Sequence, residues 1–486
     1  MSETGVNAAI VDRSHNTPVP WPAVSVLLAG LFMATLDSYI VIVAAPTIQQ
    51  DLHAAPSDVQ WVLASYQLSY AVALITAGRI GDIVGRRRVF TLGVVLFTLA
   101  SVLCALSPSV AGLIAARVAQ GLGAALIVPQ VYAVVSLVVP GVARSRVFGV
   151  VGVVLAMATI GGQLLGGVLV GADVLGTSWR PIFAVNLPIG IALLIFTRRV
   201  VPELRASAVH RLDLYGAVVL SMAVLSLTYP LVQGPELGWP RWVIVLFALS
   251  VLLLGGFVAV EAAVDRRGGD PLLRLRLFAA PTFTLGLLLV VALYAVITSY
   301  YLALSVSLQD GLGLSALDAG LVYVPAAGMF FASSLLAGRL VPRYGTPVLL
   351  IGGAILSIGY AAAGLVLVTV QEMSIAVLVP LLMVQSVGGG LVITPALNVV
   401  LAGVAPDDTG MASGLLSTAQ QIGAALGVAV IGGLFFADFD PELGSARHAA
   451  AHGFATASFA ACAIAALATA LICAIAREPS RRDRSQ

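Results

Sequence analysis

The chain has 486 residues, of which 59% are hydrophobic and 10% are charged, and its formal net charge is +2. Soluble domains carry about 25% charged residues, so this composition excludes a water-facing surface and predicts a lipid-facing one. A bilayer core about 30 Å thick requires about 20 apolar residues for each helical crossing. The sequence therefore predicts an all-α integral membrane protein.

Fourteen apolar stretches are long enough to cross the bilayer. In chain order they cover residues 22–46, 59–80, 89–107, 110–134, 147–172, 181–200, 213–233, 242–262, 282–305, 318–341, 347–369, 375–401, 411–436 and 454–476. The first follows a polar tail and contains Asp37, whereas a cleaved signal segment has a short apolar core and small residues at its cleavage site. We therefore expect it to remain as the first span.

Short motifs recur between the two halves of the chain at similar offsets, from 260 to 265 residues. The repeats are Gly78-Arg79 with Gly85 and Gly338-Arg339 with Gly345, then Gln120 with Gly123 and Gln385 with Gly388, then Gly162 with Gly166 and Gly423 with Gly427. A common offset indicates a duplicated six-span unit, and a binding site between two such units is typical of secondary transporters.

The duplication divides the chain into five segments. We expect a cytoplasmic tail at 1–21, a six-helix bundle at 22–201, linkers with two additional spans at 202–276, a second six-helix bundle at 277–476 and a cytoplasmic tail at 477–486.

All 25 basic residues are arginines, and their distribution predicts the orientation of the chain. With the N-terminus inside, 21 of them fall in cytoplasmic segments, whereas only Arg180, Arg241 and Arg447 fall outside. Cytoplasmic segments of membrane proteins carry an excess of basic residues. The sequence therefore predicts that both termini are cytoplasmic. Since the arginines follow this topology, no basic face remains to bind nucleic acid.

Several classes of activity lack the residues that they need. Without lysine the chain has no GxxxxGK[ST] nucleotide-binding loop, which excludes a nucleotide-driven pump. The five histidines lie outside the predicted spans, so we expect no intramembrane metal site and no enzymatic base. The three cysteines fall within predicted spans, and we expect no disulfide. The sequence calls for no cofactor.

Five motifs resemble those of the major facilitator superfamily, specifically its fourteen-span drug:proton antiporters. They are Gly78–Arg88 between spans 2 and 3, Leu113–Ala125 on span 4, Leu36–Pro46 on span 1, Gly162–Gly167 on span 5 and Trp179–Pro188 at the entry to span 6. The resemblance extends over essentially the whole chain. It implies a bacterial inner-membrane protein built as two six-helix bundles, with two extra central spans.

The sequence departs from the family pattern at a few positions. Tyr39 and Ile42 stand where threonine and asparagine are usual, Gln163 where proline is typical and Ala158 where a glycine is. The change at Gln163 falls in the antiporter motif of span 5, so a proton-coupled importer or a metabolite exporter stays an alternative to a drug exporter. A passive channel or a membrane receptor is the alternative outside active transport.

Asp37 and Arg117 lie well inside predicted spans, where a charge costs about 2.5 to 3.5 kcal/mol on insertion scales. Counting about 1.5 Å per residue, Asp37 lies about 13 Å and Arg117 about 10 Å below the outer face. The two are therefore at a similar depth and can pair. They form either a fixed ion bridge that joins two helices or a proton-coupling pair, and the resemblance implies the second.

The loop at 78–88 has two interpretations. Its arginines and Gly85 fit a basic anchor on a tight turn, and Asp82 among these arginines fits a contact that closes the inner face. The resemblance implies a gating loop that contains Gly78, Asp82, Gly85 and Arg86.

A cavity for an organic substrate requires an apolar and aromatic lining with a few polar groups. We expect the polar groups to come from Tyr66, Tyr70, Gln163, Gln385 and Gln420; the competing interpretation is helix packing. Gly162, Gly166, Gly423 and Gly427 are spaced for close helix contact.

Taken with the resemblance, these features predict a proton-coupled secondary transporter that exports small organic molecules such as drugs or antibiotics by alternating access. Its expected partners are a small-molecule substrate, protons and the lipid bilayer, without nucleotide or nucleic acid. The sequence leaves the oligomeric state open.

Overall fold

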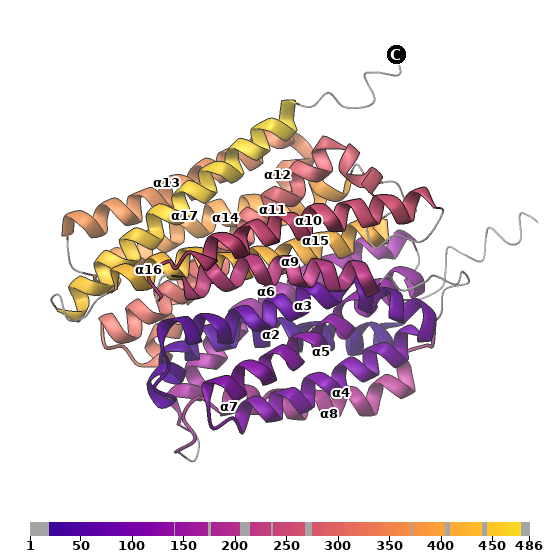
Figure 1. Ribbon diagram of the computed structural model, residues 1–486, viewed down its shortest axis with the longest axis horizontal. Coiled ribbons are helices and arrows are strands. Elements are labelled where there is room, and N and C mark those ends of the chain that lie inside the picture. Colours follow the sequence, from indigo (N-terminus) through magenta and orange to yellow (C-terminus); the bar gives the residue numbers. More distant parts are fainter. Residues whose placement is uncertain are drawn as a thin grey trace, which may run out of the picture.

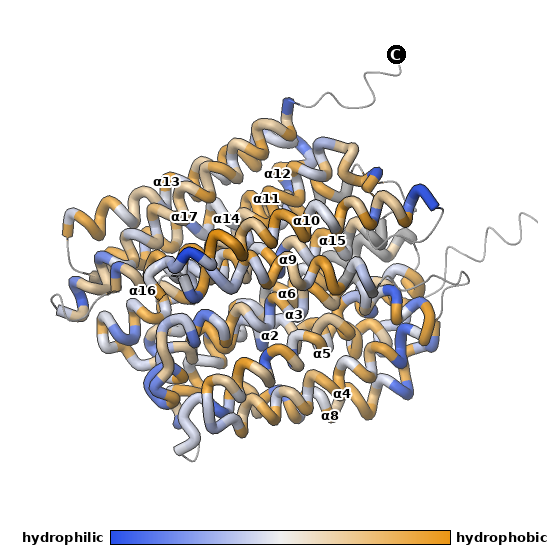
Figure 2. Tube along the Cα trace, in the orientation of Figure 1, coloured by the Kyte–Doolittle hydropathy of each residue, from blue (hydrophilic) through white to orange (hydrophobic). Residues whose placement is uncertain are grey.

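The computed structural model describes residues 19–139, 141–173, 176–204, 214–234, 237–267, 275–370, 373–402, 404, 409–439 and 445–477. Every element within these ranges is a helix, and the helices run side by side along the longest axis of the molecule (Figure 1). Most of both predicted tails and parts of both central linkers lie outside the described residues. Hydrophilic residues gather toward the ends of the helices, with apolar stretches between them (Figure 2). This distribution is the one that a bilayer requires of a membrane-spanning bundle.

The described part of the first half of the chain contains seven helices. They are α2 (Trp21–Asp51), α3 (Pro56–Val84), α4 (Arg86–Ala105), α5 (Val110–Val138), α6 (Gly141–Gly171), α7 (Pro181–Ala184) and α8 (Asn186–Val200). The last two correspond to the predicted sixth span, which is interrupted at Val185.

Two central helices follow, and the second half of the chain completes the fold. The central pair is α9 (Leu214–Gln233) and α10 (Trp242–Arg266). The second half consists of η3 (Leu275–Ala279), α11 (Pro281–Val306), η4 (Ser307–Gly311), α12 (Ala316–Tyr344), α13 (Thr346–Val370), α14 (Ile375–Ala402), α15 (Thr409–Gly427), η6 (Val428–Gly432), α16 (Gly433–Asp438) and α17 (Ala446–Arg477).

Among the described residues, 12 helices are long and apolar enough to cross a membrane. α3 is bent by 49° between its parts Pro56–Leu74 and Thr76–Val84, and it makes a thirteenth if the two parts form one span. The apolar segment Val218–Gln233 of α9 is shorter than these membrane-spanning helices. The all-helical membrane fold is therefore confirmed, whereas the number of fourteen spans is not.

Two details of the predicted elements were wrong. α2 continues past Pro46 to Asp51, because helices in membranes tolerate a proline where neighbouring groups take up the freed backbone carbonyl. Asp37 therefore lies further from the end of its helix than we expected. α17 begins at Ala446, so that His448 and His452 lie on a helix and not in a loop.

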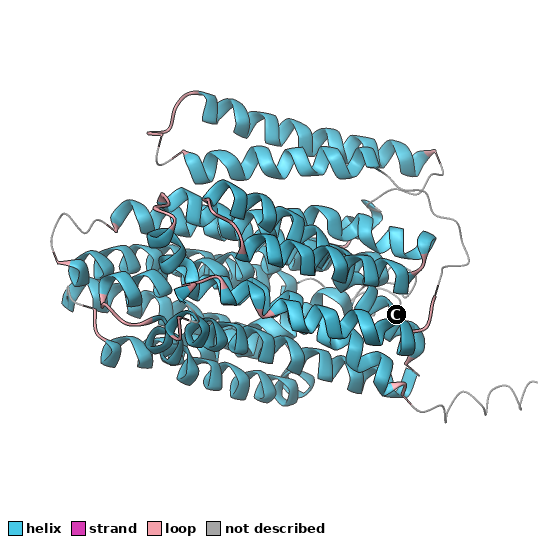
Figure 3. Ribbon diagram, turned by 90° about the horizontal axis from the view of Figure 1, so that it is seen from below, coloured by secondary structure: helices cyan, strands magenta, loops and turns pink. Residues whose placement is uncertain are grey.

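The two halves of the chain meet along two pairs of helices. α3 packs along α15, and α6 packs along α12. Figure 1 shows the indigo to purple first half beside the orange to yellow second half, with α9 and α10 in front of both. In Figure 3 this pair forms a separate layer on the outside of the body.

Aromatic rings join the central pair to the first half. The ring of Tyr229 on α9 lies 5.9 Å from that of Trp61 on α3 and 5.9 Å from that of Trp242 on α10, measured between centroids. Deeper in the pair, the Ser250 hydroxyl donates to the Ala223 carbonyl at 2.8 Å. α9 also contacts α15, so the pair covers the seam between α3 and α15 on one side of the molecule.

Candidate functional site

A fully buried ion pair lies inside the first bundle. The Nη1 atom of Arg117 on α5 lies 2.5 Å from Oδ2 of Asp37 on α2, and neither side chain is exposed. Placing two charges at such a position is costly unless each is well partnered. The polar groups around the pair therefore decide whether it is stable.

Neutral donors complete the environment of the Asp37 carboxylate. Its Oδ1 atom accepts from Gln120 Nε2 and from Asn186 Nδ2, both at 2.7 Å. The same two amides donate to the Ser101 hydroxyl oxygen at 3.1 and 2.9 Å, and that hydroxyl donates to the Phe183 carbonyl at 2.9 Å. Both carboxylate oxygens are thus bound by donors from different helices, which partly offsets the cost of burying the charge.

The Arg117 guanidinium is held on several sides. Its Nε donates to the Val62 carbonyl at 3.2 Å, and its Nη1 also donates to Gln120 Oε1 at 2.8 Å. Its central carbon lies 4.2 Å from the ring centroid of Tyr66, within the range of a cation–π contact. Its Nη2 is buried without a hydrogen-bond partner in the described structure, so one donor of this arginine is available for a further acceptor.

The site joins six helices of the first bundle: α2, α3, α4, α5, α7 and α8. The predicted partnership of Asp37 and Arg117 is present, and Tyr66 lies in the same group, where its hydroxyl donates to the Ala34 carbonyl at 3.0 Å. Sequence reasoning did not assign Ser101, Gln120 or Asn186 to this site. A signal was available for two of them, because Gln120 and Asn186 are amides within apolar spans.

The other proposed substrate residues lie elsewhere. Tyr70 packs edge-on against Tyr66, with ring centroids 6.0 Å apart. Gln163 on α6 is buried, and its Nε2 has no hydrogen-bond partner in the described structure. Gln385 on α14 donates to the Tyr300 hydroxyl at 3.0 Å in the second bundle, and Gln420 is half-buried on α15.

The gating-loop residues surround the junction of α3 and α4. Asp82 binds Arg86 at 2.5 Å. Gly85 has a φ of +115°, a backbone conformation that favours glycine. Gly78 lies on the last part of α3, which leads into this junction. The chain after α8 folds back onto this junction, where Arg86 N donates to the Leu204 carbonyl at 2.9 Å.

Glu203 is the residue of this region that sequence reasoning missed. Its Oε1 accepts from the Arg87 amide at 3.2 Å, at the start of α4. The carboxylate sits against Gly85, where any side chain would collide with it. A carboxylate at a helix N-terminus is favourable, so Glu203 holds the segment after α8 against the start of α4.

Glycine pairs bring equivalent helices together in the two bundles. A Cβ atom on Gly162 or on Gly166 would lie 2.8 Å from the carbonyl oxygen of Leu36 or Ile40 of α2, respectively. In the second bundle Gly423 makes the corresponding approach to Val291 of α11, and Gly427 approaches Ala295. Only glycine permits backbones to come this close.

The model of one protein family matches the chain over residues 27–428 and again over 287–486, and it describes the Major Facilitator Superfamily. The chain belongs to this superfamily. Its members are membrane transporters and not enzymes, in agreement with the sequence prediction.

Two relatives of this superfamily member are closely similar over most of their length. A probable actinorhodin transporter of Streptomyces coelicolor is 35% identical over 86% of this chain and 72% of its own. The cephamycin export protein CmcT of Amycolatopsis lactamdurans is 36% identical over 87% of this chain and 87% of its own.

Solved structures share the facilitator fold. The crystal structure of a bacterial homologue of the human lysosomal transporter Spinster, in an inward-facing and occupied conformation, matches with a TM-score of 0.67. It is 18% identical and covers 95% of this chain and 98% of its own. At this identity the match establishes the fold alone.

Proposed function

We propose that this transporter exports small organic molecules of the antibiotic class in exchange for protons, and that Asp37 carries the proton. The observation that carries the proposal is the buried Asp37–Arg117 pair with the two neutral donors Gln120 and Asn186. The two relatives, a probable actinorhodin transporter and a cephamycin export protein, support the substrate class and the outward direction.

Proton coupling follows from the two environments that Asp37 can occupy. In the described arrangement, donors from α5 and α8 stabilise the charge of the buried carboxylate. If α2 moves away from these helices, the carboxylate stays buried but loses its donors, and the neutral form becomes favoured. The freed Arg117 then requires another acceptor, and a substrate with a carbonyl or carboxylate group provides one.

The contacts between the halves favour a cycle of alternating access. Gln50 Nε2 donates to Asp310 Oδ1 at 2.8 Å, and Gln309 Nε2 donates to the Val43 carbonyl at 2.8 Å. Both join the end of α2 to the region where η4 follows α11. The arginine distribution assigns this end to the outside, so the described conformation has its outer side closed.

The remaining features fit this proposal. We infer fourteen spans, with α9 and the bent α3 both crossing the membrane, cytoplasmic termini and the five segments given by the sequence. Asp82 and Arg86 belong to a gating loop on the inner side, and the substrate path includes Tyr70, Gln163, Gln385 and Gln420. The unpartnered Nε2 of Gln163 is suited to a substrate acceptor.

Import by proton symport is the second candidate, favoured by Gln163 in place of the typical proline of the span 5 motif. The direction of movement decides between them. In vesicles with the transporter in one orientation, a proton gradient drives substrate and protons in opposite directions for an exporter, and in the same direction for an importer.

The test of the proton carrier compares wild type with Asp37→Asn in reconstituted vesicles. Asparagine mimics the neutral carboxyl, so we expect gradient-driven transport to be lost while exchange of labelled for unlabelled substrate without a gradient persists. Asp58→Asn makes the same chemical change near the start of α3 and serves as the matched control. Full gradient-driven transport by Asp37→Asn would remove Asp37 from the mechanism.

A further inference from the structure

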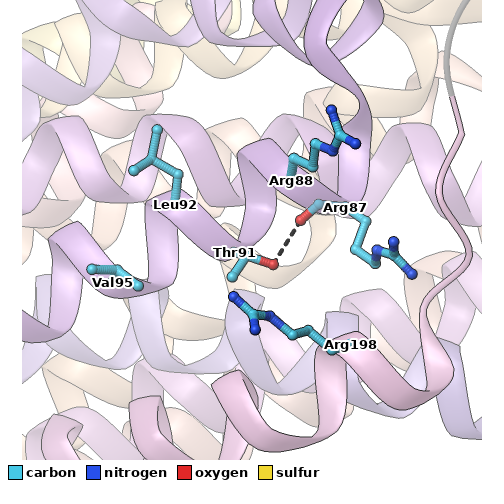
Figure 4. Close-up of a pocket in the computed structure, with 6 residues that line it drawn as sticks. All are labelled: Arg87, Arg88, Thr91, Leu92, Val95 and Arg198. Carbon is cyan, nitrogen blue, oxygen red and sulfur yellow. Dashed lines mark hydrogen bonds between the residues drawn. The ribbon is translucent and has the colours of Figure 1, made fainter.

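A second site lies on the membrane-facing side of the first bundle, away from the Asp37 group. A cavity of about 480 Å³ is lined by Arg87, Arg88, Thr91, Leu92 and Val95 of α4 and by Arg198 of α8. Arg198 extends from α8 toward Thr91, with Leu92 and Val95 further along α4 (Figure 4). None of these residues belongs to the buried ion-pair site.

The cavity carries an excess of positive charge. Arg87 and Arg88 share one carboxylate, with their Nε atoms 3.5 and 3.6 Å from Glu203 Oε2. Within the described part of the chain, no carboxylate forms an ion pair with Arg198. Three guanidinium groups and one carboxylate leave a net charge of +2 at this position, which attracts an anion.

One wall of the same cavity is apolar and is exposed on the surface of the protein. Leu92 is 57% exposed, and Val95 lies almost one turn further into the span. The Thr91 hydroxyl donates to the Arg87 carbonyl at 2.8 Å, so this hydroxyl is already engaged as a donor within α4. The arginines thus stand at the end of two membrane-spanning helices, and the apolar wall runs from them toward the middle of the bilayer.

We propose that this cavity binds an anionic phospholipid, with the phosphate against Arg88 and Arg198 and an acyl chain along Leu92 and Val95. The order of charge and apolar surface along α4 matches the order of headgroup and chain in a phospholipid. Basic pockets between membrane helices bind anionic headgroups. A soluble phosphate ion satisfies the arginines but leaves the apolar wall uncovered, and a zwitterionic lipid does not neutralise the excess charge.

The structure provides a matched pair of variants for the test. Arg198 lines the cavity, whereas Arg199 is the next residue of the same last turn, is also exposed and does not line it. Arg198→Gln and Arg199→Gln remove the same charge at the same depth. Both side chains are exposed, so both variants are expected to fold as wild type does, which equal melting temperatures in neutral detergent verify.

The experiment measures binding of phosphatidylglycerol and of phosphatidylcholine to the full-length protein in neutral detergent, by native mass spectrometry. One basic side chain strengthens binding to an anionic lipid by about fivefold. We therefore expect Arg198→Gln to weaken phosphatidylglycerol binding about fivefold, Arg199→Gln to leave it unchanged, and neither to alter phosphatidylcholine binding.

A parallel arm separates the lipid from a free anion. We expect millimolar inorganic phosphate neither to displace phosphatidylglycerol nor to raise the melting temperature as that lipid does. Equal phosphatidylglycerol binding by wild type and Arg198→Gln would overturn the proposal. So would an equal loss in both arginine variants, which indicates general charge attraction, or full replacement of the lipid by phosphate.

Discussion

The two bundles share a repeated sequence pattern, but they differ in charge around the equivalent glutamines Gln120 and Gln385. In the first, Gln120 binds the Asp37–Arg117 pair. In the second, its counterpart Gln385, 265 residues later, binds the Tyr300 hydroxyl at 3.0 Å and the Gly359 carbonyl at 3.2 Å.

The neighbours of Gln385 are also neutral. The Tyr300 hydroxyl lies 3.3 Å from that of Ser458, and Leu382 occupies the position equivalent to Arg117 by the same offset. The duplication has therefore kept a buried amide in each bundle, while only the amide of the first bundle binds charged groups. The comparison supports the proposal that the proton site lies in the first bundle, with a neutral counterpart in the second.

The most severe way to break this asymmetry is Arg117→Leu, which gives the first bundle the leucine of the second. The change leaves Asp37 buried without its cation, and breaking a buried pair in this way costs about 3–5 kcal/mol. We expect a large loss of folded protein and a lower melting temperature, measured by size-exclusion chromatography and thermal unfolding in detergent.

The double variant Asp37→Asn with Arg117→Leu is the control for this prediction. It removes both charges, so most of the lost stability returns, although gradient-driven transport stays absent. If the double variant were as unstable as Arg117→Leu, the instability would come from lost packing around the guanidinium and not from an unpaired carboxylate.

Substitution of the two equivalent glutamines tests the same difference between the bundles, with a smaller expected effect. Gln120→Leu and Gln385→Leu each remove buried hydrogen bonds, at a typical cost of about 1 kcal/mol for each bond. We expect a larger loss of thermal stability for Gln120→Leu, which removes more bonds and two to charged groups. We expect a shifted pH dependence of transport only for this variant, because Gln120 contacts Asp37. An equal shift in both variants would contradict a proton site confined to the first bundle.

The smallest effect is expected at the gating loop. Asp82 and Arg86 are partly exposed, with side-chain exposures of 23% and 16%, and such pairs contribute roughly 0–1 kcal/mol. Asp82→Asn should slow transport by a few fold without changing substrate affinity, since the loop lies far from Asp37. The measurement is a transport rate beside a binding isotherm, and an unchanged rate would reduce Asp82 to a local contact.

The sequence predicted those parts of the molecule that depend on hydrophobic length and on charge. The helices follow the predicted spans, and Asp37 meets Arg117 because two opposite charges at one depth have few other partners in lipid. Ser101 and Asn186 were missed as members of the site, since small polar residues are common in membrane helices and the rotation of each helix decides what they face.

Other features depend on contacts between segments that are distant in the sequence, so the sequence did not predict them. Glu203 lies in a linker, and nothing local requires that segment to fold back onto the start of α4. The extension of α2 beyond Pro46 depends on groups of neighbouring helices, and the position of α9 over the seam between α3 and α15 depends on packing between both halves.

The neighbouring rings of Trp61, Tyr229 and Trp242 give the protein an intrinsic fluorescent reporter. Trp61 is fixed to α3, the helix that also carries Tyr66 and leads into the gating loop, while Trp242 is fixed to the central pair. Any sliding of α3 past α9 separates rings that now lie 5.9 Å apart. Intrinsic tryptophan emission, compared between wild type and Tyr229→Leu, can therefore follow the conformational cycle in real time without an attached dye.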